Sequence, residues 1–366
     1  METKAFKDLE LSRLGMGNMR LPQKSNGKID WEESQKIIDY AMAHGINYYD
    51  TAHVYNGGES ESCLGHCVKK YPRDSFYLAT KFHIGSRKDY EAVFAEQLER
   101  LQTDHIDFYL IHCLMDGNID EYLNSGAIEF FQRMKAEGKI RYLGFSSHAG
   151  VDTLRRFADS HEWDFAQLQL NYYDWVAGTS EAEYRVLEER NIPVMVMEPV
   201  RGGRLAALTP ETEKTLKEAH ADWSIASWAL RFVKSLPGVQ VILSGMSSME
   251  QIIDNVNTFS DGKGLTEEEN KLLLKVCDEF RSQIHIPCTA CRYCTDGCPM
   301  KINIPEYLKL LNRCKADGTW GAKESYDRID SEGKATDCIG CGRCMSHCPQ
   351  ELKIPNYMAE LAQLIG

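Results

Sequence analysis

Short runs rich in β-branched and aromatic residues alternate, over the first 245 residues, with longer segments in which apolar residues recur every three or four positions. The short runs have the length and composition of buried strands, and the longer segments have the period of amphipathic helices. Eight runs fit the strand pattern: residues 12–17, 46–52, 76–82, 106–112, 140–147, 165–172, 193–199 and 239–245. The pattern therefore predicts eight strands that alternate with helices.

The helical segments carry recognisable start and stop residues. Asp30 is suited to cap a helix that begins at Trp31, and Gly45 is suited to end it. Similar periodicity predicts helices over residues 90–102, 121–138, 248–259 and 266–283.

Eight strands that alternate with helices favour a (β/α)8 TIM barrel over an open doubly wound sheet. An open sheet that binds a dinucleotide carries the fingerprint G-x-G-x-x-G after its first strand. In the segment GMGNMR, Arg20 stands where the third glycine would fall. The predicted fold class is therefore α/β, with the barrel formed by residues 1–283.

Composition changes after residue 283 to cysteine, glycine and proline, which predicts a second domain over residues 284–366. This segment contains an internal repeat, because CPMKINIPEYLKLL and CPQELKIPNYMAEL match at a constant offset of 50 residues. In each copy a proline, Pro305 or Pro355, stands where a helix would begin. We expect a small, mostly helical domain.

Charge and hydropathy exclude several classes of function. The chain of 366 residues has a net charge of −12, from 54 acidic and 42 basic residues, and it has no basic stripe suited to nucleic acid. It has no apolar run long enough to span a membrane, and the N-terminal segment lacks the apolar centre of a signal peptide. We therefore expect a cytoplasmic protein, in which clustered cysteines bind metal more often than they form disulfides.

Eight of the 13 cysteines form two runs with the same spacing. Each run has the form C-x2-C-x2-C-x3-C-P, which is typical of the bacterial ferredoxin sequence that binds two [4Fe–4S] clusters. In such proteins the fourth cysteine of each run binds the cluster of the other run. We assign cluster one to Cys288, Cys291, Cys294 and Cys348, and cluster two to Cys338, Cys341, Cys344 and Cys298. A zinc site is the weaker alternative, because zinc needs only four thiolates and does not require two complete runs.

Four ionisable residues lie at or just after predicted strand ends, where barrel enzymes place their chemistry. These residues are Asp50, Tyr55, Lys81 and His112. A lysine ammonium beside Tyr55 would favour the phenolate and lower the pKa of the phenol. Asp50 would hold Lys81, and His112 could donate a hydrogen bond to a carbonyl oxygen. The four side chains together suit protonation of a carbonyl oxygen as hydride reaches its carbon.

The segment D50-T-A-x-x-Y55, followed by Lys81 and His112 on successive strand ends, resembles the tetrad of the aldo-keto reductase family. The resemblance covers residues 10–260 and implies a barrel that binds NAD(P)H without a Rossmann domain and reduces an aldehyde or ketone. It also implies nucleotide contacts by the following residues: Gly17, Asn18, Ser146, Ser147, Gln167, Met197, Arg201, Gly202, Gly203, Ser244, Gly245, Gln251 and Asn255. Gln169, on the same strand face, is a rival to Gln167.

Four of these positions depart from the family pattern. Ser147 replaces an asparagine, and Met197 replaces the aromatic residue that stacks on the nicotinamide. The lysine and arginine that bind the 2′-phosphate of NADPH are replaced by Gly245 and Gln251. Loss of two cations removes charge-assisted contacts to that phosphate, which favours NADH.

A hydride carries two electrons and a cluster moves one, so the clusters cannot simply reduce the nucleotide. Three hypotheses follow. The chain is an NAD(P)H-dependent carbonyl reductase whose clusters are structural or redox-sensing. Alternatively, the clusters exchange single electrons with a partner protein, with a flavin on the barrel as one variant. In the third hypothesis the chain is a redox-sensing subunit without turnover. The sequence leaves open the substrate, the cluster potentials and the oligomeric state.

Overall fold

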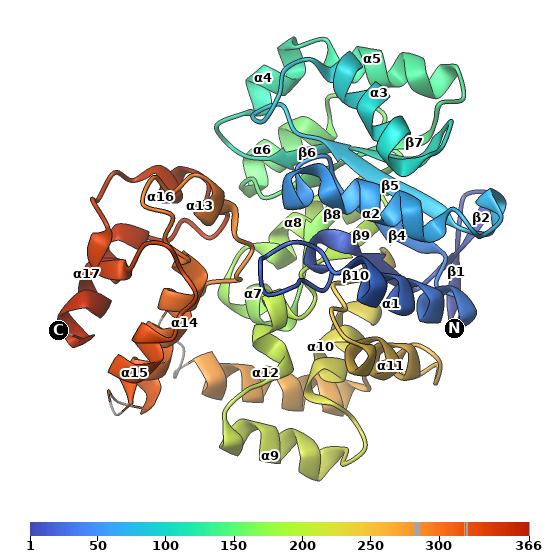
Figure 1. The fold of residues 1–366 in the computed structure, drawn as a ribbon. Coiled ribbons are helices and arrows are strands. Elements are labelled where there is room, and N and C mark those ends of the chain that lie inside the picture. Colours follow the sequence, from blue (N-terminus) through green and yellow to red (C-terminus); the bar gives the residue numbers. More distant parts are fainter. Residues whose placement is uncertain (282–285, 318, 320, 366) are drawn as a thin grey trace. The chain divides into compact units, whose positions relative to one another are not determined.

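The computed structural model describes residues 1–281, 286–317, 319 and 321–365 (Figure 1). The described chain forms two compact units. The first unit comprises Met1–Val200 and Trp223–Asn270, and the second comprises Arg201–Asp222 and Lys271–Gly366. The domain boundary expected near residue 284 lies outside the described residues.

The first unit is a closed barrel of eight parallel strands in the order β10-β3-β4-β5-β6-β7-β8-β9. The strands are β3 (Leu14–Gly17), β4 (Tyr48–Asp50), β5 (Tyr77–Phe82), β6 (Ile106–Leu114), β7 (Ile140–Ser147), β8 (Phe165–Gln169), β9 (Val194–Met197) and β10 (Val239–Ser244). Each lies within or overlaps one of the eight predicted runs. The predicted barrel is therefore confirmed.

Helices surround the barrel, so the strands are buried on both faces and their sequences are almost continuously apolar. Every residue of β6 is buried. The helices of the first unit are α1 (Trp31–Ala43), α2 (Glu59–Val68), α3 (Tyr90–Leu101), α4 (Ile119–Asn124), α5 (Ala127–Ala136), α6 (Val151–Ala158), α7 (Tyr172–Ala177), α8 (Ser180–Glu189), α10 (Ile225–Lys234) and α11 (Met249–Thr258). Asp30 caps α1 as predicted, because its carboxylate accepts from the backbone N–H groups of Glu32 and Glu33.

Two predicted elements differ in extent from the structure. The helix expected over residues 121–138 is divided into α4 and α5, because Gly126 at the junction has a φ of +80°. The strand expected over residues 165–172 ends at Gln169, and Asn171 then caps α7 by accepting from the backbone N–H of Asp174.

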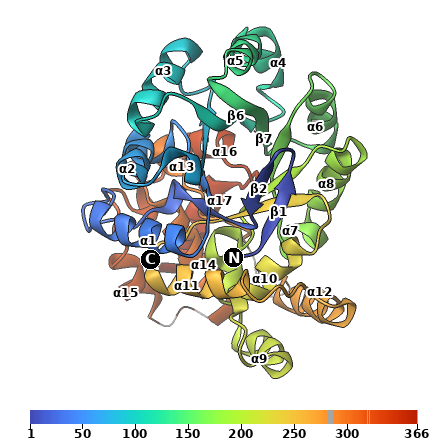
Figure 2. The ribbon, with the colours of Figure 1, turned by 90° about the vertical axis from the view of Figure 1, so that its right-hand side faces the viewer.

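A hairpin precedes the barrel and was not predicted. Its strands β1 (Thr3–Phe6) and β2 (Leu9–Ser12) pair antiparallel, with Phe6 opposite Leu9. Figure 2 shows the hairpin in front of the near end of the barrel. Phe6, Leu9 and Leu11 belong to one buried cluster with barrel residues that include Phe108 and Phe165. The hairpin therefore closes this end of the barrel with apolar side chains.

The second unit is mostly helical, as predicted. Its helices are α9 (Pro210–Ala219), α12 (Glu267–Arg281, which begins in the first unit), α13 (Tyr293–Asp296), α14 (Ile304–Asp317), α15 (Ala322–Asp327), α16 (Arg343–Ser346) and α17 (Ile354–Ile365). Its core includes Tyr307, Leu311, Tyr326, Met358 and Leu361. The repeated prolines stand at the second residue of α14 and of α17, one position later than predicted.

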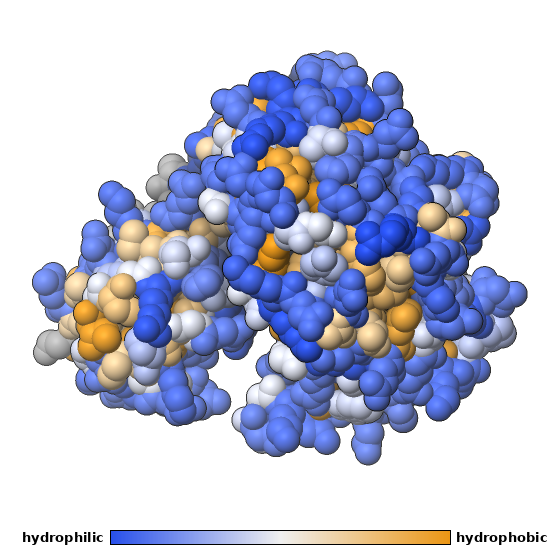
Figure 3. Space-filling view, turned by 90° about the horizontal axis from the view of Figure 1, so that it is seen from above, coloured by the Kyte–Doolittle hydropathy of each residue, from blue (hydrophilic) through white to orange (hydrophobic). Residues whose placement is uncertain are grey.

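The visible face of the molecule is mostly hydrophilic, with isolated apolar patches (Figure 3). Among the described residues, no helix has both the length and the hydropathy needed to cross a membrane. The large hydrophobic residues that the described chain exposes are Val176, Ile253, Ile339, Met345 and Leu364. Two of these, Ile339 and Met345, lie in the second cysteine run.

Candidate functional site

The barrel brings Asp50, Lys81 and His112 to the ends of three adjacent strands. Asp50 is the last residue of β4, Lys81 is the fifth of six residues in β5, and His112 lies near the end of β6. Neighbouring strands pair β4 with β5 and β5 with β6. Because the strands are parallel, their carboxyl ends meet at one face of the barrel.

Lys81 lies at the centre of this group. Its Nζ donates to Asp50 Oδ1 at 2.5 Å and to the carbonyl oxygen of Thr51 at 2.6 Å. Both charged side chains are buried, with 0% of Lys81 and 3% of Asp50 exposed. Gln167 holds the carboxylate in turn, because its Nε2 donates to Asp50 Oδ2 at 3.2 Å. The ammonium group is therefore held by two acceptors, Asp50 Oδ1 and the backbone oxygen of Thr51.

Tyr55 follows β4 and begins a short 3-10 turn, η2 (Tyr55–Gly58). Lys81 Nζ lies 3.5 Å from the Tyr55 hydroxyl and 4.9 Å from the centre of its ring. The turn contains Asn56, Gly57 and Gly58 with φ values of 51°, 63° and 91°. This left-handed stretch, which glycine adopts without steric cost, reverses the chain directly after Tyr55.

His112 completes the group. Its ring meets that of Tyr55 edge to face, with ring centres 5.7 Å apart, and meets that of His83 at 5.6 Å. Tyr122 donates its hydroxyl hydrogen to the backbone oxygen of His112 at 2.5 Å, which holds the strand end. His112 Nδ1 is buried and has no partner among the described residues. A buried polar atom without a partner is suited to a hydrogen bond with a bound molecule.

Burial shifts the protonation equilibria of these groups. It lowers the pKa of His112 well below the usual 6.5, and the nearby Lys81 and His83 lower it further. Burial also raises the pKa of Asp50 and lowers the pKa of Lys81, while their mutual attraction opposes both shifts. The imidazole of His112 is therefore neutral near pH 7.

Several residues expected to bind the nucleotide lie around this group. Asn18 Nδ2 donates to the backbone oxygen of Asp50 at 2.9 Å, and its Oδ1 is buried without a described partner. Ser146 Oγ accepts from the backbone N–H of Cys113, the residue after His112, at 2.8 Å. Ser147 Oγ accepts from Ala149 N at 3.1 Å. Gln167 contacts the tetrad directly, whereas its rival Gln169 donates to Asp174 Oδ2 at 2.7 Å.

A second set of predicted contacts gathers after β10. Asn255 Nδ2, on α11, donates to Ser244 Oγ at the end of β10 at 2.8 Å. Gln251 Oε1 accepts from Ser247 N at 2.7 Å. A Cβ at Gly17 would lie 3.4 Å from the backbone oxygen of Ser244, and one at Gly245 would lie 3.2 Å from Arg20 Cβ. Gly17 therefore lies beside the end of β10, and Gly245 lies beside Arg20.

The segment after β9 holds the remaining predicted contacts. Met197 is the last residue of β9. Gly202 and Gly203 have φ values of 66° and 92° within η4 (Arg201–Ala206). Arg201 is 2% exposed, and its guanidinium lies 3.5 Å from Gln350 Oε1, within the second unit. Arg201 therefore contacts the segment that follows the second cysteine run.

The cysteines of the two runs line two separate hollows of the second unit. The first hollow is lined by Cys288, Cys291, Cys294 and Cys348. The second is lined by Cys338, Cys341, Cys344 and Cys298. Each hollow thus receives three cysteines from one run and the last cysteine from the other. Within the described residues, no three His, Cys, Asp or Glu side chains converge as they would on a single metal ion.

The thiols of these hollows differ in exposure. Cys294, Cys344 and Cys348 are buried, whereas Cys341 is exposed. Burial raises the pKa of Cys344 to about 11 and also raises that of Cys288 and of Cys348. Binding of a metal deprotonates such thiols, so these values describe the chain without metal.

The sequence analysis missed the polar network beneath Lys81. Glu61, on α2, is fully buried and accepts from Thr80 Oγ1 at 2.6 Å and from Gln97 Nε2 at 2.9 Å. Gln97 also donates to the backbone oxygen of Lys81 at 3.0 Å, and Arg100 pairs with Glu61 at 3.2 Å. The sequence feature that could have indicated this network is Glu61 itself, a charged residue within the otherwise largely buried helix ESESCLGHCV.

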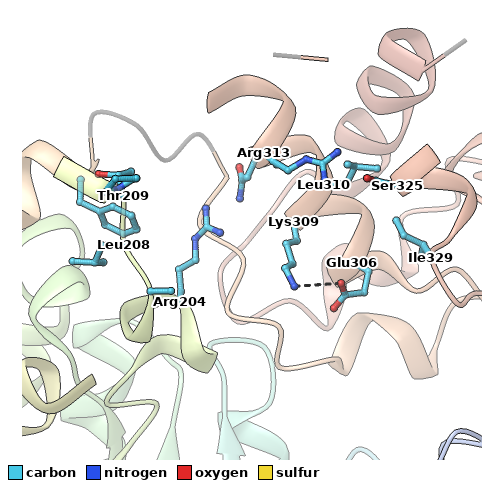
Figure 4. A pocket seen from close by; sticks show the side chains of 13 residues that line it. Arg204, Leu208, Thr209, Glu306, Lys309, Leu310, Arg313, Ser325 and Ile329 are labelled. Carbon is cyan, nitrogen blue, oxygen red and sulfur yellow. Dashed lines mark ion pairs between the residues drawn. The ribbon is translucent and has the colours of Figure 1, made fainter. Parts of the chain in front are cut away.

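The second unit also has a cavity of about 450 Å³ (Figure 4). Arg204, Lys309 and Arg313 contribute cations to its lining, and Glu306 pairs with Lys309 at 3.7 Å. Its walls contain no tetrad residue, no cysteine and no predicted nucleotide contact. The reactive side chains therefore lie elsewhere than in this cavity.

Comparison with known proteins agrees with this geometry. The model of the aldo/keto reductase family matches residues 13–277, and that of a 4Fe-4S dicluster domain matches residues 287–352. The chain is 30% identical over 301 residues to "Uncharacterized oxidoreductase YqkF" of Bacillus subtilis (strain 168), covering 73% of this chain and 92% of that protein. It is 27% identical over 300 residues to "NADH-specific methylglyoxal reductase" of Escherichia coli (strain K12), covering 68% and 90%.

Solved structures show the same fold. The holo form of aldo-keto reductase AKR11C1 from Bacillus halodurans matches with a TM-score of 0.64 and 29% identity, over 75% of this chain and 96% of that chain. An aldo/keto reductase from Klebsiella pneumoniae in complex with NADP and acetate matches with a TM-score of 0.61 and 22% identity, over 75% and 93%. The chain therefore belongs to the aldo/keto reductase family of NAD(P)-dependent oxidoreductases and carries a 4Fe-4S dicluster domain.

Proposed function

We propose that the chain reduces an aldehyde or ketone to an alcohol, with Tyr55 as the proton donor and NAD(P)H as the source of hydride. The position of Lys81 Nζ between Asp50 Oδ1 at 2.5 Å and the Tyr55 hydroxyl at 3.5 Å carries this proposal. When bound, the nucleotide supplies a hydride to the carbonyl carbon. Tyr55 supplies the proton to the oxygen, so the product is a neutral alcohol.

Each tetrad residue has a distinct role in this proposal. The Lys81 ammonium stabilises the phenolate that Tyr55 becomes as it loses its proton. Asp50 holds Lys81 in position. Neutral His112 has one ring N–H that can donate to the carbonyl oxygen and orient it toward Tyr55. The buried Nδ1 of His112 supports a contact with substrate.

We propose the nucleotide contacts that the family resemblance implies, with NADH favoured over NADPH. The buried and unpartnered Oδ1 of Asn18 supports a bound molecule at this face. Arg20 packs against Gly245, but it pairs with Glu198 at 2.9 Å, so its charge is already balanced. The similar reductase of Escherichia coli is named as NADH-specific, which supports the same preference. The ratio of kcat/KM for NADH to that for NADPH should exceed one.

We also propose that residues 284–366 form the cluster-binding domain and hold two [4Fe–4S] clusters. Cluster one would be held by Cys288, Cys291, Cys294 and Cys348, and cluster two by Cys338, Cys341, Cys344 and Cys298. The two hollows, each lined by one of these sets, support the crossed assignment. Thiolate is the ligand that iron–sulfur clusters take, and each set offers four.

Three cysteine substitutions test the crossed assignment. Cys298→Ala and Cys338→Ala should disturb the same cluster, whereas Cys348→Ala should disturb the other. Each substitution should lower iron from about eight to about four atoms per chain, and EPR of the reduced protein should group the first two variants together. If Cys298→Ala instead resembles Cys348→Ala, the assignment is wrong.

Tyr55→Phe is the direct test of carbonyl reduction. The variant keeps the ring that contacts Lys81 and His112 but loses the acidic hydrogen. General acid catalysis typically contributes about 10²–10⁴-fold, so kcat should fall by that factor while nucleotide binding is retained. Tyr49→Phe is a matched control, because the Tyr49 hydroxyl donates to the backbone oxygen of Ile46 at 3.0 Å, away from the tetrad. Equal loss in both variants would contradict the role of Tyr55.

Anaerobic spectra distinguish the roles left to the clusters. Bleaching of the cluster absorbance by NADH would support electron exchange with the barrel. Bleaching by dithionite alone would support structural or sensing clusters, and release of a flavin would support the variant with a bound flavin. A cytoplasmic location and a small carbonyl substrate belong to the same proposal.

A further inference from the structure

The two cysteine runs differ in one respect that their common spacing does not explain. At the offset of 50 residues, Thr289 of the first run corresponds to Ile339 of the second, and Thr295 corresponds to Met345. Thr289 is 2% exposed and Ile339 is 64% exposed, while Met345 is 41% exposed. In the first of these pairs the buried residue is the small polar one and the exposed residue is the large apolar one, which is the reverse of ordinary burial.

The same asymmetry extends to the ligands. Cys341 of the second run is exposed, whereas its counterpart Cys291 is only partly so. Ile339 and Met345 stand on either side of Cys341 and Cys344 in the chain. Single exposed hydrophobic residues are common, but two in one cysteine loop of a mostly hydrophilic surface indicate a contact surface. The second hollow thus has the more exposed cysteine and carries the exposed apolar residues beside it.

The charge of Arg343 indicates what kind of protein would bind this surface. Arg343 begins α16, between Cys341 and Met345, and is exposed. In the part of the chain that the structure describes, its guanidinium has no carboxylate partner. The first run has Tyr293 at this position. The surface thus has apolar side chains around an exposed cation that no carboxylate neutralises. It is complementary to a protein that carries acidic residues around the apolar surface over its own redox centre.

We propose that the loop from Cys338 to Cys348 is the docking surface for a small acidic one-electron carrier protein, and that cluster two is the one that exchanges electrons with it. This inference rests on the proposed binding of two clusters. In each encounter one electron leaves the reduced carrier and enters the chain, so one carrier molecule is oxidised and no atom is transferred. Ile339, Met345 and Arg343 form the contact.

The repeat supplies the substitutions that test this surface. Ile339→Thr and Met345→Thr introduce the residues that the first run carries at the same positions, so the cysteine geometry should be kept. The probe is an acidic [2Fe–2S] ferredoxin, with its Kd for the anaerobically purified holoprotein measured by calorimetry. We expect the double variant to raise the Kd about tenfold or more, and added salt to weaken binding to the unmodified chain. Ile253→Thr, at a comparably exposed residue of α11, is the matched control and should leave the Kd unchanged.

Two further measurements separate this inference from the proposed function. Iron content and the rate of cluster reduction by methyl viologen, which needs no docking surface, should be the same in the variants and in the unmodified chain. If Ile339→Thr lowers the iron content, Met345→Thr alone decides the result. An unchanged Kd in the variants, or no binding of the ferredoxin to the unmodified chain, overturns the proposal. The proposal is also overturned if the unmodified chain dimerises and the double variant does not, because the surface would then bind a second copy of the chain. Absence of clusters from the unmodified chain refutes the proposed function itself.

Discussion

A single buried ion pair determines how the tetrad is assembled. Lys81 is fully buried, and its partners are the carboxylate of Asp50 and the backbone oxygen of Thr51. Removal of water from two charges costs more free energy than their attraction usually returns, so such a pair is weak evidence for a stabilising role. Its value lies in fixing the ammonium group next to Tyr55.

Substitution of Lys81 should therefore affect both stability and activity. Lys81→Met leaves the carboxylate of Asp50 buried without a positively charged partner, which should lower the free energy of unfolding by about 3–5 kcal/mol. The double variant Asp50→Asn/Lys81→Met should regain part of this stability but none of the activity. Lys70→Met is the control, because its pair with Asp39 is solvent-exposed and should be worth at most about 1 kcal/mol. Urea unfolding monitored by tryptophan fluorescence measures all three, and equal losses at positions 81 and 70 would contradict the argument.

Two histidines of the barrel, His112 and His148, make stability depend on pH. Burial lowers the pKa of His148 from 6.5 to about 4, and that of His112 also lies well below 6.5. The unfolded chain therefore binds protons at a higher pH than the folded chain, and stability should fall as the pH decreases from 6.5 to about 4. Asp8, with its pKa held at about 2 by Tyr142 and Arg141, acts below this window. Thermal melts should show a flatter profile for His148→Asn, and an unchanged slope would contradict the assignment.

Among single residues, the sequence allowed prediction of those ionisable side chains that lie at strand ends. The four tetrad residues were predicted because a barrel places strand ends together, and their type suited proton transfer. Glu61 and Gln97 were missed, because they lie on helices and reach the site through contacts between distant segments. Helical periodicity marks a buried face but does not show which polar residue on it contacts a strand end.

Among the elements, the β1–β2 hairpin is the addition that the periodicity did not reveal. Its strands have four residues each, too few for an alternation to be recognised. The eight barrel strands were found because burial on both faces makes them apolar throughout. The division between α4 and α5 was missed because glycine is tolerated within many helical patterns.

The hairpin should contribute substantially to the stability of the barrel. The ring of Phe6 lies 5.5 Å from that of Phe108, 5.1 Å from that of Tyr142 and 6.5 Å from that of Phe165. Phe6→Ala removes these contacts and leaves a cavity, which should cost about 3–5 kcal/mol in the free energy of unfolding. Ile253→Ala, at an exposed position of α11, should change the free energy of unfolding by no more than about 0.5 kcal/mol. A small effect in urea unfolding of Phe6→Ala would mean that the hairpin merely covers the barrel.

For the whole molecule, the domain boundary indicated by residue composition differs from the division into compact units that the structure shows. Composition changes near residue 284, but Arg201–Asp222 belongs to the same compact unit as Lys271–Gly366. Contacts such as the one between Arg201 and Gln350 join segments 149 residues apart. A profile of residue composition cannot reveal such contacts, because it compares only residues that are close together in the sequence.

Truncation after residue 283 should therefore expose a segment far from the cut. Without Gln350 and the rest of its unit, the chain around Arg201 and Arg204 loses the contacts that bury it. Limited trypsin digestion should cleave the truncated protein at these arginines faster than the full chain, as measured by mass spectrometry of the products. Exposed sites such as Arg155 provide the control and should be cleaved at equal rates in both proteins. Equal cleavage at Arg201 and Arg204 would mean that the residues after 283 do not protect this segment.

The two cysteine loops reach one backbone shape with different residues. Ala290 and Arg292 have φ values of 54° and 69°, where the second loop has Gly340 and Gly342 at 68° and 75°. The left-handed conformation costs an L-residue roughly 1–2 kcal/mol and costs glycine almost nothing. The two copies of the repeat therefore share a backbone geometry rather than a sequence, and the second copy adopts that geometry at the lower conformational cost.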